Sequence, residues 1–260
     1  DMELDPPFSW MADKPDTFRY HCENDTGPAF DYTRNRRREL GRRILALRRI
    51  YLDTKYWVYA RDVYMNRPQK QIHIQIVDEL RRLRNKGTTL CPVSYHVFNE
   101  LMLQSDSSTR KATAEIIDEL SDGCTISPWL YLFKHELYHF YTRATQPDVV
   151  LRPVGELVWT KAAFIVGDMF CDTKDSGLPE HIAEAMIKAM DDMLWTAKLS
   201  EVVDEIPPNA SETNALVANA KAMTDGKFDH ASSDDSFRKL FLDEVRGGLD
   251  GFTDILEDFL

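Results

Sequence analysis

The chain has 260 residues, of which 43% are hydrophobic, so it can bury a substantial core as one large domain or two small ones. Its formal net charge of -11 disfavours a broad, sequence-blind polyanion binder, while local basic patches stay compatible with it. The four cysteines form no Cys-x-x-Cys pair and no apolar run is long enough to cross a bilayer, which favours a cytoplasmic protein without a membrane span.

The N-terminal part separates into an arm and an arginine-rich segment. Residues 1–33 are rich in proline, aspartate and aromatic residues without sustained periodicity, which predicts an extended arm. Residues 34–49 hold eight arginines interleaved with leucine and isoleucine, which predicts a helix. Two interpretations of these arginines stay open: a solvated basic face of the helix, or a patch that contacts phosphate groups.

A crossover unit follows the arginine-rich segment. Residues 49–53, RIYLD, predict a strand, and residues 69–86 predict an amphipathic helix that Gly87 ends. A second strand is predicted within residues 88–94, TTLCPVS, where Ser94 is placed to cap the next helix. Because strand, helix, strand and helix alternate at this spacing, we expect the two strands to be parallel.

A further helix is predicted at residues 107–121, and it leads into a third short strand at residues 124–127. Downstream of this strand the sequence favours helices almost throughout. The predicted helices cover residues 128–143, 153–168, 179–203, 210–223 and 234–260. An α/β domain with a parallel sheet, joined to a mostly helical annex, is therefore the expected architecture.

Residues 133–141, FKHELYHFY, contain the His-Glu-x-x-His pattern of zinc hydrolases at His135 and His139. Two histidines four residues apart on a helix can hold one zinc ion, and the intervening glutamate can act as a general base. The apolar stripe of this helix lies nearly opposite the histidines, which predicts that they face solvent or a polar neighbour. Neither Asp148 nor Glu156 stands at a defensible spacing for a third ligand, so a zinc hydrolase is the less favoured hypothesis.

Two acidic residues stand where the first two parallel strands end. Asp53 follows the first strand, and Glu100 lies on the helix that leaves the second. Ligands of open parallel sheets bind at the carboxyl ends of the strands, and two carboxylates that meet there favour Mg²⁺ or Mn²⁺. We therefore predict Asp53 and Glu100 as metal ligands and catalytic residues. The structural alternatives are a helix cap for Asp53 and a solvated helix position for Glu100.

The ordered segments YLDTKYWVYARD, CPVSYHVFNEL and ELSDGCTISP resemble the opening half of PIN-domain nucleases, over residues 47–127. The resemblance implies a Rossmann-like parallel sheet with crossover helices. In this family three or four acids hold divalent ions, which position and activate water for the hydrolysis of RNA. By position, Asp53 matches the first metal ligand of this family and Glu100 the second. Lys55 departs from the family, in which asparagine is common at this position, and the closing acids of the pattern are not clearly present.

The chain also resembles larger PIN-like proteins, in which a helical segment is inserted before the closing acids. This implies an N-terminal arm and arginine-rich helix at 1–46, the first half of the PIN-like domain at 47–127, and a helical insertion or annex at 128–260. The closing acids would then lie beyond Leu260, and weaker candidates for them within the chain are Glu212, Asn214, Asp225 and Asp229.

Two functions follow from the resemblance. The first is a Mg²⁺- or Mn²⁺-dependent ribonuclease, of a general or a toxin-like kind. It would act on RNA, favour single strands and contact the RNA through residues 34–49. The second is a catalytically silent PIN-like scaffold that binds RNA or a protein partner, such as an antitoxin, through its helical annex.

Overall fold

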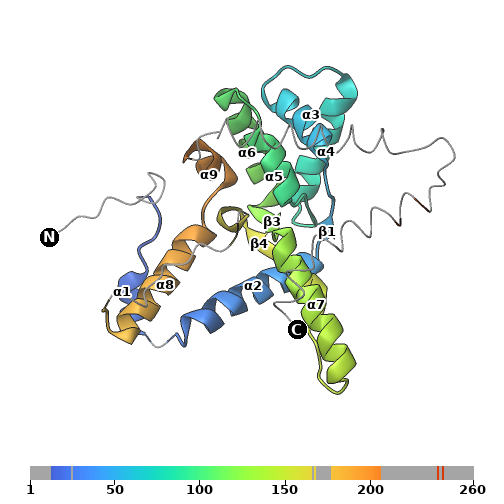
Figure 1. Cartoon of the computed structure of the whole chain (residues 1–260). Helices are drawn as coiled ribbons and strands as arrows, with labels where there is room; N and C mark the ends of the chain where they lie inside the picture. Colours follow the sequence, from blue (N-terminus) through green and yellow to red (C-terminus); the bar gives the residue numbers. More distant parts are fainter. Residues whose placement is uncertain are drawn as a thin grey trace. The chain divides into compact units, whose positions relative to one another are not determined.

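The computed structural model describes residues 13–24, 26–165, 167, 177–205, 239 and 242. The chain divides into two units, Asp1–Pro208 and Asn209–Leu260, and the elements named here belong to the first. Within the described residues the fold mixes helix and sheet, is mostly helical, and has small sheets (Figure 1). None of the helices in these ranges is long and apolar enough to span a bilayer. The helices predicted at 210–223 and 234–260 lie outside the description, apart from the isolated residues 239 and 242.

The elements alternate between helices and short strands up to residue 126 and are mainly helical after it. In chain order they are α1 (Phe18–Glu23), α2 (Ala29–Leu45), β1 (Arg48–Arg49), α3 (Thr54–Tyr64), α4 (Gln71–Asn85), β2 (Thr89–Leu90), α5 (Tyr95–Met102), α6 (Ser107–Ser121), β3 (Cys124–Ile126), α7 (Trp129–Thr145), the 3-10 helix η2 (Val154–Glu156), β4 (Trp159–Lys161), the 3-10 helix η3 (Ala162–Phe164), α8 (Glu180–Trp195) and α9 (Leu199–Glu205).

The crossover unit predicted from the sequence is confirmed. β1 and β2 pair in parallel, with Arg48 opposite Thr89, and the Ile50 amide extends the pairing by donating to the Leu90 carbonyl at 3.1 Å. Each strand has two residues, so this parallel pairing is shorter than the strands predicted at 49–53 and 88–94. The chain beyond β2 continues in parallel beside β3 through a bridge between Val93 and Thr125.

The helix boundaries of this unit follow the local signals. Ser94 caps α5, since its Oγ accepts from the Val97 amide at 3.4 Å, as predicted. α6 covers the predicted residues, and Gly87 ends the α4 region with a φ of 67°, where glycine meets no steric penalty. Asp106 caps α6 by accepting from the Thr109 amide at 2.9 Å.

The prediction of an extended arm is wrong for residues 18–23, which form α1, and for residues 29–33, which belong to α2. Pro28 stands at the cap position of α2 with an extended ψ of 143°, where its missing amide hydrogen costs no helical hydrogen bond, so the helix can begin at Ala29. Its buried residues Leu40, Gly41 and Ile44 face one side, which leaves most of the arginines for the other faces of the helix.

The predicted helix at 153–168 is also wrong, since this segment forms η2, β4 and η3. Pro153 and Gly155 disfavour helix, and the aromatic and β-branched residues Trp159 and Thr160 favour a strand. β4 pairs antiparallel with β3, where Ile126 stands opposite Trp159. The predicted helix 179–203 is helical but interrupted, and it forms α8 and α9.

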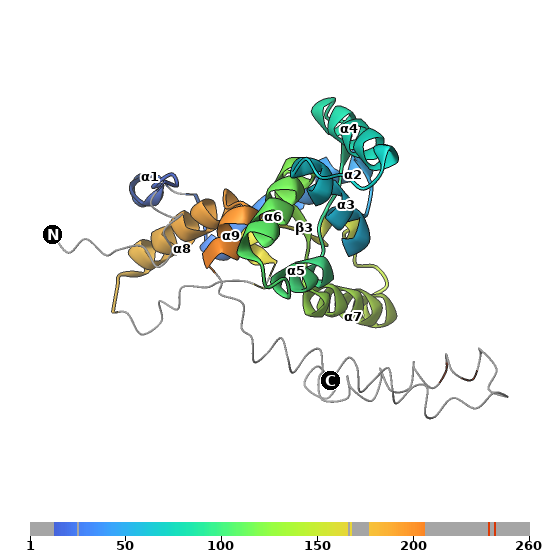
Figure 2. The same cartoon turned by 90° about the horizontal axis from the view of Figure 1, so that it is seen from above.

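The main core gathers around α6, whose Ile116, Ile117 and Leu120 have no exposed surface, and it includes the fully buried Trp57 of α3. α9 lies alongside α6 in both views of the fold (Figure 2). Asp118 of α6 fixes this contact by accepting from the backbone amides that open α9, Leu199 N at 2.7 Å among them. The helical segment after residue 128 therefore shares a core with the α/β elements.

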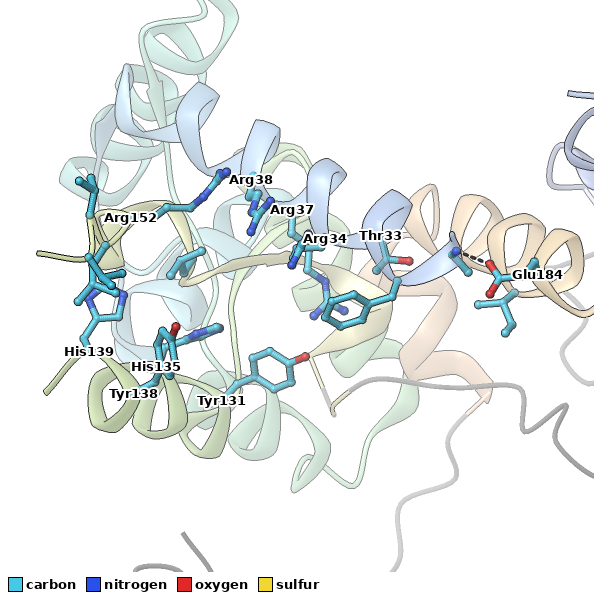
Figure 3. A pocket seen from close by; sticks show the side chains of 17 residues that line it. Thr33, Arg34, Arg37, Arg38, Tyr131, His135, Tyr138, His139, Arg152 and Glu184 are labelled. Carbon is cyan, nitrogen blue, oxygen red and sulfur yellow. Dashed lines mark hydrogen bonds between the residues drawn. The ribbon is translucent and has the colours of Figure 1, made fainter. Parts of the chain in front are cut away.

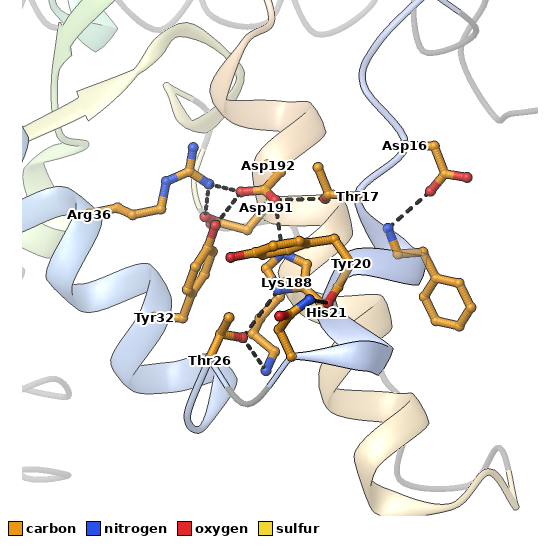
Figure 4. A network of polar contacts seen from close by, with 12 residues as sticks. Asp16, Thr17, Tyr20, His21, Thr26, Tyr32, Arg36, Lys188, Asp191 and Asp192 are labelled. Carbon is orange, nitrogen blue, oxygen red and sulfur yellow. Dashed lines mark hydrogen bonds and ion pairs between the residues drawn. The ribbon is translucent and has the colours of Figure 1, made fainter.

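A polar network joins α1, α2 and α8 (Figure 4). Asp192 accepts from Thr17 Oγ1 at 2.6 Å and from the Tyr32 hydroxyl at 2.7 Å, and it lies 2.9 Å from His21 Nε2. Arg36 bridges to both Asp192 and Asp191.

The pKa values of the two aspartates of this network are shifted in opposite directions. Burial opposes ionisation of Asp192, but its hydrogen bonds and Arg36 outweigh burial, so the pKa of Asp192 is lowered. Burial dominates at Asp191 and raises its pKa, since Arg36 is its main compensating partner. Burial and the bond to Asp192 raise the pKa of Tyr32 to about 12.

Candidate functional site

Asp53 lies between β1 and α3 and occupies the cap position of α3. Its side chain is exposed, and Oδ1 accepts from the Thr54 amide at 2.9 Å, so the capping interpretation of this residue is confirmed. The adjacent Thr54 Oγ1 is buried, and no described group forms a hydrogen bond with it. A buried hydroxyl without a partner, next to an exposed carboxylate, is a feature that a bound water or ion would satisfy.

Glu100 lies near the end of α5 and is exposed, as the solvated-helix interpretation predicted. Ser94 caps α5, and its Oγ lies 3.0 Å from the Tyr51 hydroxyl. This bond ties the segment that carries Asp53 to the start of the helix that carries Glu100. α3 also packs against α5. The structure thus places Asp53 at the cap of α3 and Glu100 on α5, which packs against α3, and their sharing of one cation stays a prediction.

Other acidic residues of this region have structural partners. Asp62 is buried and pairs with Arg61 at 2.8 Å and with Arg67 at 3.5 Å. In contrast, neither Asp53 nor Glu100 forms an ion pair within the described residues. The ammonium of Lys55, the residue that departs from the PIN pattern, lies over the Tyr59 ring at 5.9 Å from its centroid.

The donor chemistry suits a hard cation, because carboxylate oxygens are the ligands that Mg²⁺ and Mn²⁺ prefer. Among the described residues, however, no group of three or more histidine, cysteine, aspartate or glutamate side chains is arranged to hold a metal ion. The predicted additional acids, Glu212, Asn214, Asp225 and Asp229, lie outside the described residues.

α7 confirms the helix predicted around the His-Glu-x-x-His pattern, but it presents a different face to the protein. His139 is 5% exposed, whereas Phe140 is 73% exposed and Tyr141 48% exposed. Of the two predicted surroundings, solvent is therefore wrong for His139, and a polar neighbour is the one that holds, because His139 lines a cavity that arginine side chains also line. Aromatic side chains occur on most sides of α7, so hydrophobicity alone does not select the buried face. Packing selects the face with His139 and the buried Thr142.

Both histidines line a cavity of about 710 Å³ (Figure 3). Its walls come from α2, α7, α8 and the segment 149–152. Burial lowers the pKa of His135, and the neighbouring His139 and Arg37 lower it further. Glu136 is exposed, and no third protein ligand accompanies the histidines in the described part of the chain, so the geometry adds no support to a zinc hydrolase.

Searches against protein-family models, curated proteins and solved structures find no significant match for this chain. The sites themselves are therefore the basis for any function of this chain. The sequence analysis did not identify the cavity, although one signal for it was present. Arg34, Arg37 and Arg38 stand at i, i+3 and i+4, the spacing that places side chains on one helical face.

Proposed function

We propose that this chain carries the opening half of a PIN-like nuclease domain that hydrolyses RNA phosphodiester bonds with Mg²⁺ or Mn²⁺. The observation that carries the proposal is the parallel β1–β2 crossover, with Asp53 at the cap of the helix that follows β1 and Glu100 on the helix that follows β2. The parallel bridge from Val93 to β3 extends the same pattern in the order expected of this fold. A cytoplasmic location and single-stranded RNA as substrate belong to the same proposal.

In this function Asp53 and Glu100 would hold the metal. A bound divalent ion lowers the pKa of water and neutralises charge on a phosphate group. The protein contributes position: the Tyr51–Ser94 hydrogen bond holds the two strand-end segments together, and the cap at Asp53 orients its carboxylate. Thr54 Oγ1 supplies an unused polar group beside this carboxylate.

Titration with Mn²⁺ tests the proposal without requiring catalytic activity. Asp53→Asn and Glu100→Gln should each weaken Mn²⁺ binding about tenfold or more, because each removes a charged ligand. Asp78→Asn is the matched control: it removes the same charge from an exposed position on α4, whose carboxylate is 3.9 Å from Arg81, and should bind Mn²⁺ normally.

Cleavage of a short single-stranded RNA in the presence of Mn²⁺ is the second measurement, and Asp53→Asn should abolish it while circular dichroism stays unchanged. Undiminished Mn²⁺ binding in both site variants would exclude the metal site.

The second candidate is the catalytically silent PIN-like scaffold, and the observation that favours it is the structural role of Asp53, whose carboxylate caps α3. Such a scaffold binds RNA or a protein partner, such as an antitoxin, without hydrolysis. Binding of RNA by a chain that takes up no Mn²⁺ would select this function over the nuclease.

A further inference from the structure

The cavity between α2 and α7 is basic, although the chain as a whole has a net charge of -11. Arg34, Arg37 and Arg38 extend into it from α2, and Arg152 approaches from the segment between α7 and η2 (Figure 3). The acidic residue among its described lining residues is Glu184, which already accepts a hydrogen bond from the Ala29 amide. Arg34 pairs with Asp31, whereas Arg38 and Arg152 form no ion pair within the described residues, so positive charge is in excess inside the cavity.

The arginines oppose one another there. Burial lowers the pKa of Arg38, and repulsion from Arg152 and Arg34 lowers it further, with Asp31 as the partial compensation. Arg38 Nη1 donates to Asn35 Oδ1 at 3.2 Å, while its buried Nε has no hydrogen-bond partner among the described groups. A folded protein gains nothing from such crowding of cations, whereas a bound anion would relieve it.

His139 gives a second, independent indication of a ligand. It lines the cavity, it is 5% exposed, and its Nδ1 has no hydrogen-bond partner in the described structure. A buried ring nitrogen without a partner carries a desolvation cost that a ligand group can offset. His139 stands on the wall opposite the arginines of α2, so a ligand that spans the cavity can contact both.

The remaining lining is aromatic and aliphatic. Tyr131 and Tyr138 contribute rings from α7, and the Arg34 guanidinium lies over the Phe30 ring at 5.1 Å from its centroid. Aliphatic side chains complete the walls: Val149, Val150, Leu151, Leu157 and Ile187. The ligand must therefore combine an anionic group with a flat or apolar body.

We propose that this cavity binds a nucleotide, with its phosphate group at Arg38 and Arg152 and its base against the aromatic and aliphatic walls. Guanidinium groups pair with phosphate through paired hydrogen bonds, and aromatic rings stack on bases. The volume of about 710 Å³ lies within the range of small-molecule sites. The nucleotide is either a free mononucleotide or the phosphorylated end of an RNA strand. The site uses elements other than those of Asp53 and Glu100, so it goes beyond the proposed function.

Calorimetric titration of the full chain with AMP, adenosine and inorganic phosphate tests the proposal. AMP should bind, and adenosine and phosphate should each bind about tenfold more weakly or worse, because each lacks one half of the recognised ligand. Arg38→Gln and Arg152→Gln should each weaken AMP binding by about tenfold.

Arg43→Gln is the matched control. Arg43 is on the same helix, its guanidinium is 3.8 Å from Asp122, and it does not line the cavity, so AMP affinity should not change. A 5′-phosphorylated oligoribonucleotide that binds more tightly than both its 5′-hydroxyl counterpart and AMP identifies the strand end as the ligand. If AMP binds more tightly than the oligoribonucleotide, the free nucleotide is the ligand.

Three results would overturn the proposal: no binding of AMP or the phosphorylated oligonucleotide at millimolar concentration, phosphate bound as tightly as AMP, or AMP affinity unchanged in both arginine variants. Asp53→Asn should retain wild-type AMP affinity, because Asp53 does not line the cavity. The AMP titration therefore tests nucleotide binding whether or not the nuclease proposal holds.

Discussion

Gly41 permits the close contact between α2 and η2, and replacing it with alanine gives a sharp test of this interface. A Cβ atom at Gly41 would lie 2.1 Å from the carbonyl oxygen of Glu156 and 2.8 Å from its Cα. These atoms belong to the backbone, so no side-chain rotation can remove the clash. Gly41→Ala must therefore displace η2 from α2.

Two opposing effects determine the size of the change in stability. Alanine in place of glycine inside a helix adds roughly 0.5–1 kcal/mol of stability. Overpacking of a close-packed interface costs roughly 1–3 kcal/mol, and a rigid backbone partner places this case in the upper part of that range. We therefore expect Gly41→Ala to lower the free energy of unfolding by about 1–2 kcal/mol.

Urea denaturation followed by circular dichroism measures this change, and Gly155→Ala is its matched control. Gly155 lies on the opposite side of the same interface, where a Cβ would meet Leu45 Cδ2 at 3.2 Å. Because the leucine side chain can move by a few tenths of an ångström, Gly155→Ala should cost less than Gly41→Ala. A Gly41→Ala protein at least as stable as wild type, with an unchanged dependence on urea, would refute the contact between α2 and η2.

The other predictions concern charge. The pKa of Asp192 is lowered on folding, so its ionisation contributes stability that is present above its ordinary value of 3.8 and is lost as the pH falls through the folded pKa. Asp192→Asn should therefore flatten the acid limb of a stability–pH curve measured from about pH 2 to about pH 7. Asp191 has a raised pKa, so the stability that its protonated form contributes is present below pH 3.8 and is lost as the pH rises through the folded pKa. Asp191→Asn should remove that loss. A stability–pH curve parallel to that of wild type in either variant would contradict the direction of the pKa shift given for that aspartate. Arg152→Gln relieves repulsion at Arg38, so thermal unfolding without ligand should show equal or higher stability than wild type, and a clear loss of stability would show that Arg152 has a structural partner.

The parts of the fold that sequence predicted are those that short stretches determine. Ser94 caps α5, Gly87 follows α4, and α6 covers its predicted residues because caps, glycine and helical periodicity act over a few residues. β4 is different: its strand conformation depends on pairing with β3, where Lys161 stands opposite Cys124. A helical pattern read from residues 153–168 alone contains no information about this distant partner.

The two candidate sites differ in the same way. Asp53 and Glu100 follow from a local rule about strand ends, although their sharing of one metal ion stays a prediction. The cavity joins Arg38 to Arg152 and to His139, which are distant in sequence and meet only when α7 packs near α2. Helical spacing predicts the arginine wall, and no local pattern predicts the wall opposite it. The same packing buries His139 in the cavity, so the polar neighbour that the helical wheel predicted as the alternative to solvent is the one that holds.

The two proposed sites depend on different interfaces within the fold. The cavity depends on the interface at Gly41, because η2 and the preceding segment with Arg152 lie against α2. Asp53 and Glu100 depend instead on the pairing of β1 with β2 and on the packing of α3 and α5. Gly41→Ala should therefore weaken AMP binding and leave Mn²⁺ binding intact, whereas Asp53→Asn should do the reverse. If either variant lowered both affinities equally under conditions where it remains folded, the metal and the nucleotide would share one site, and the assignment of α2 and α7 to a separate site would be wrong.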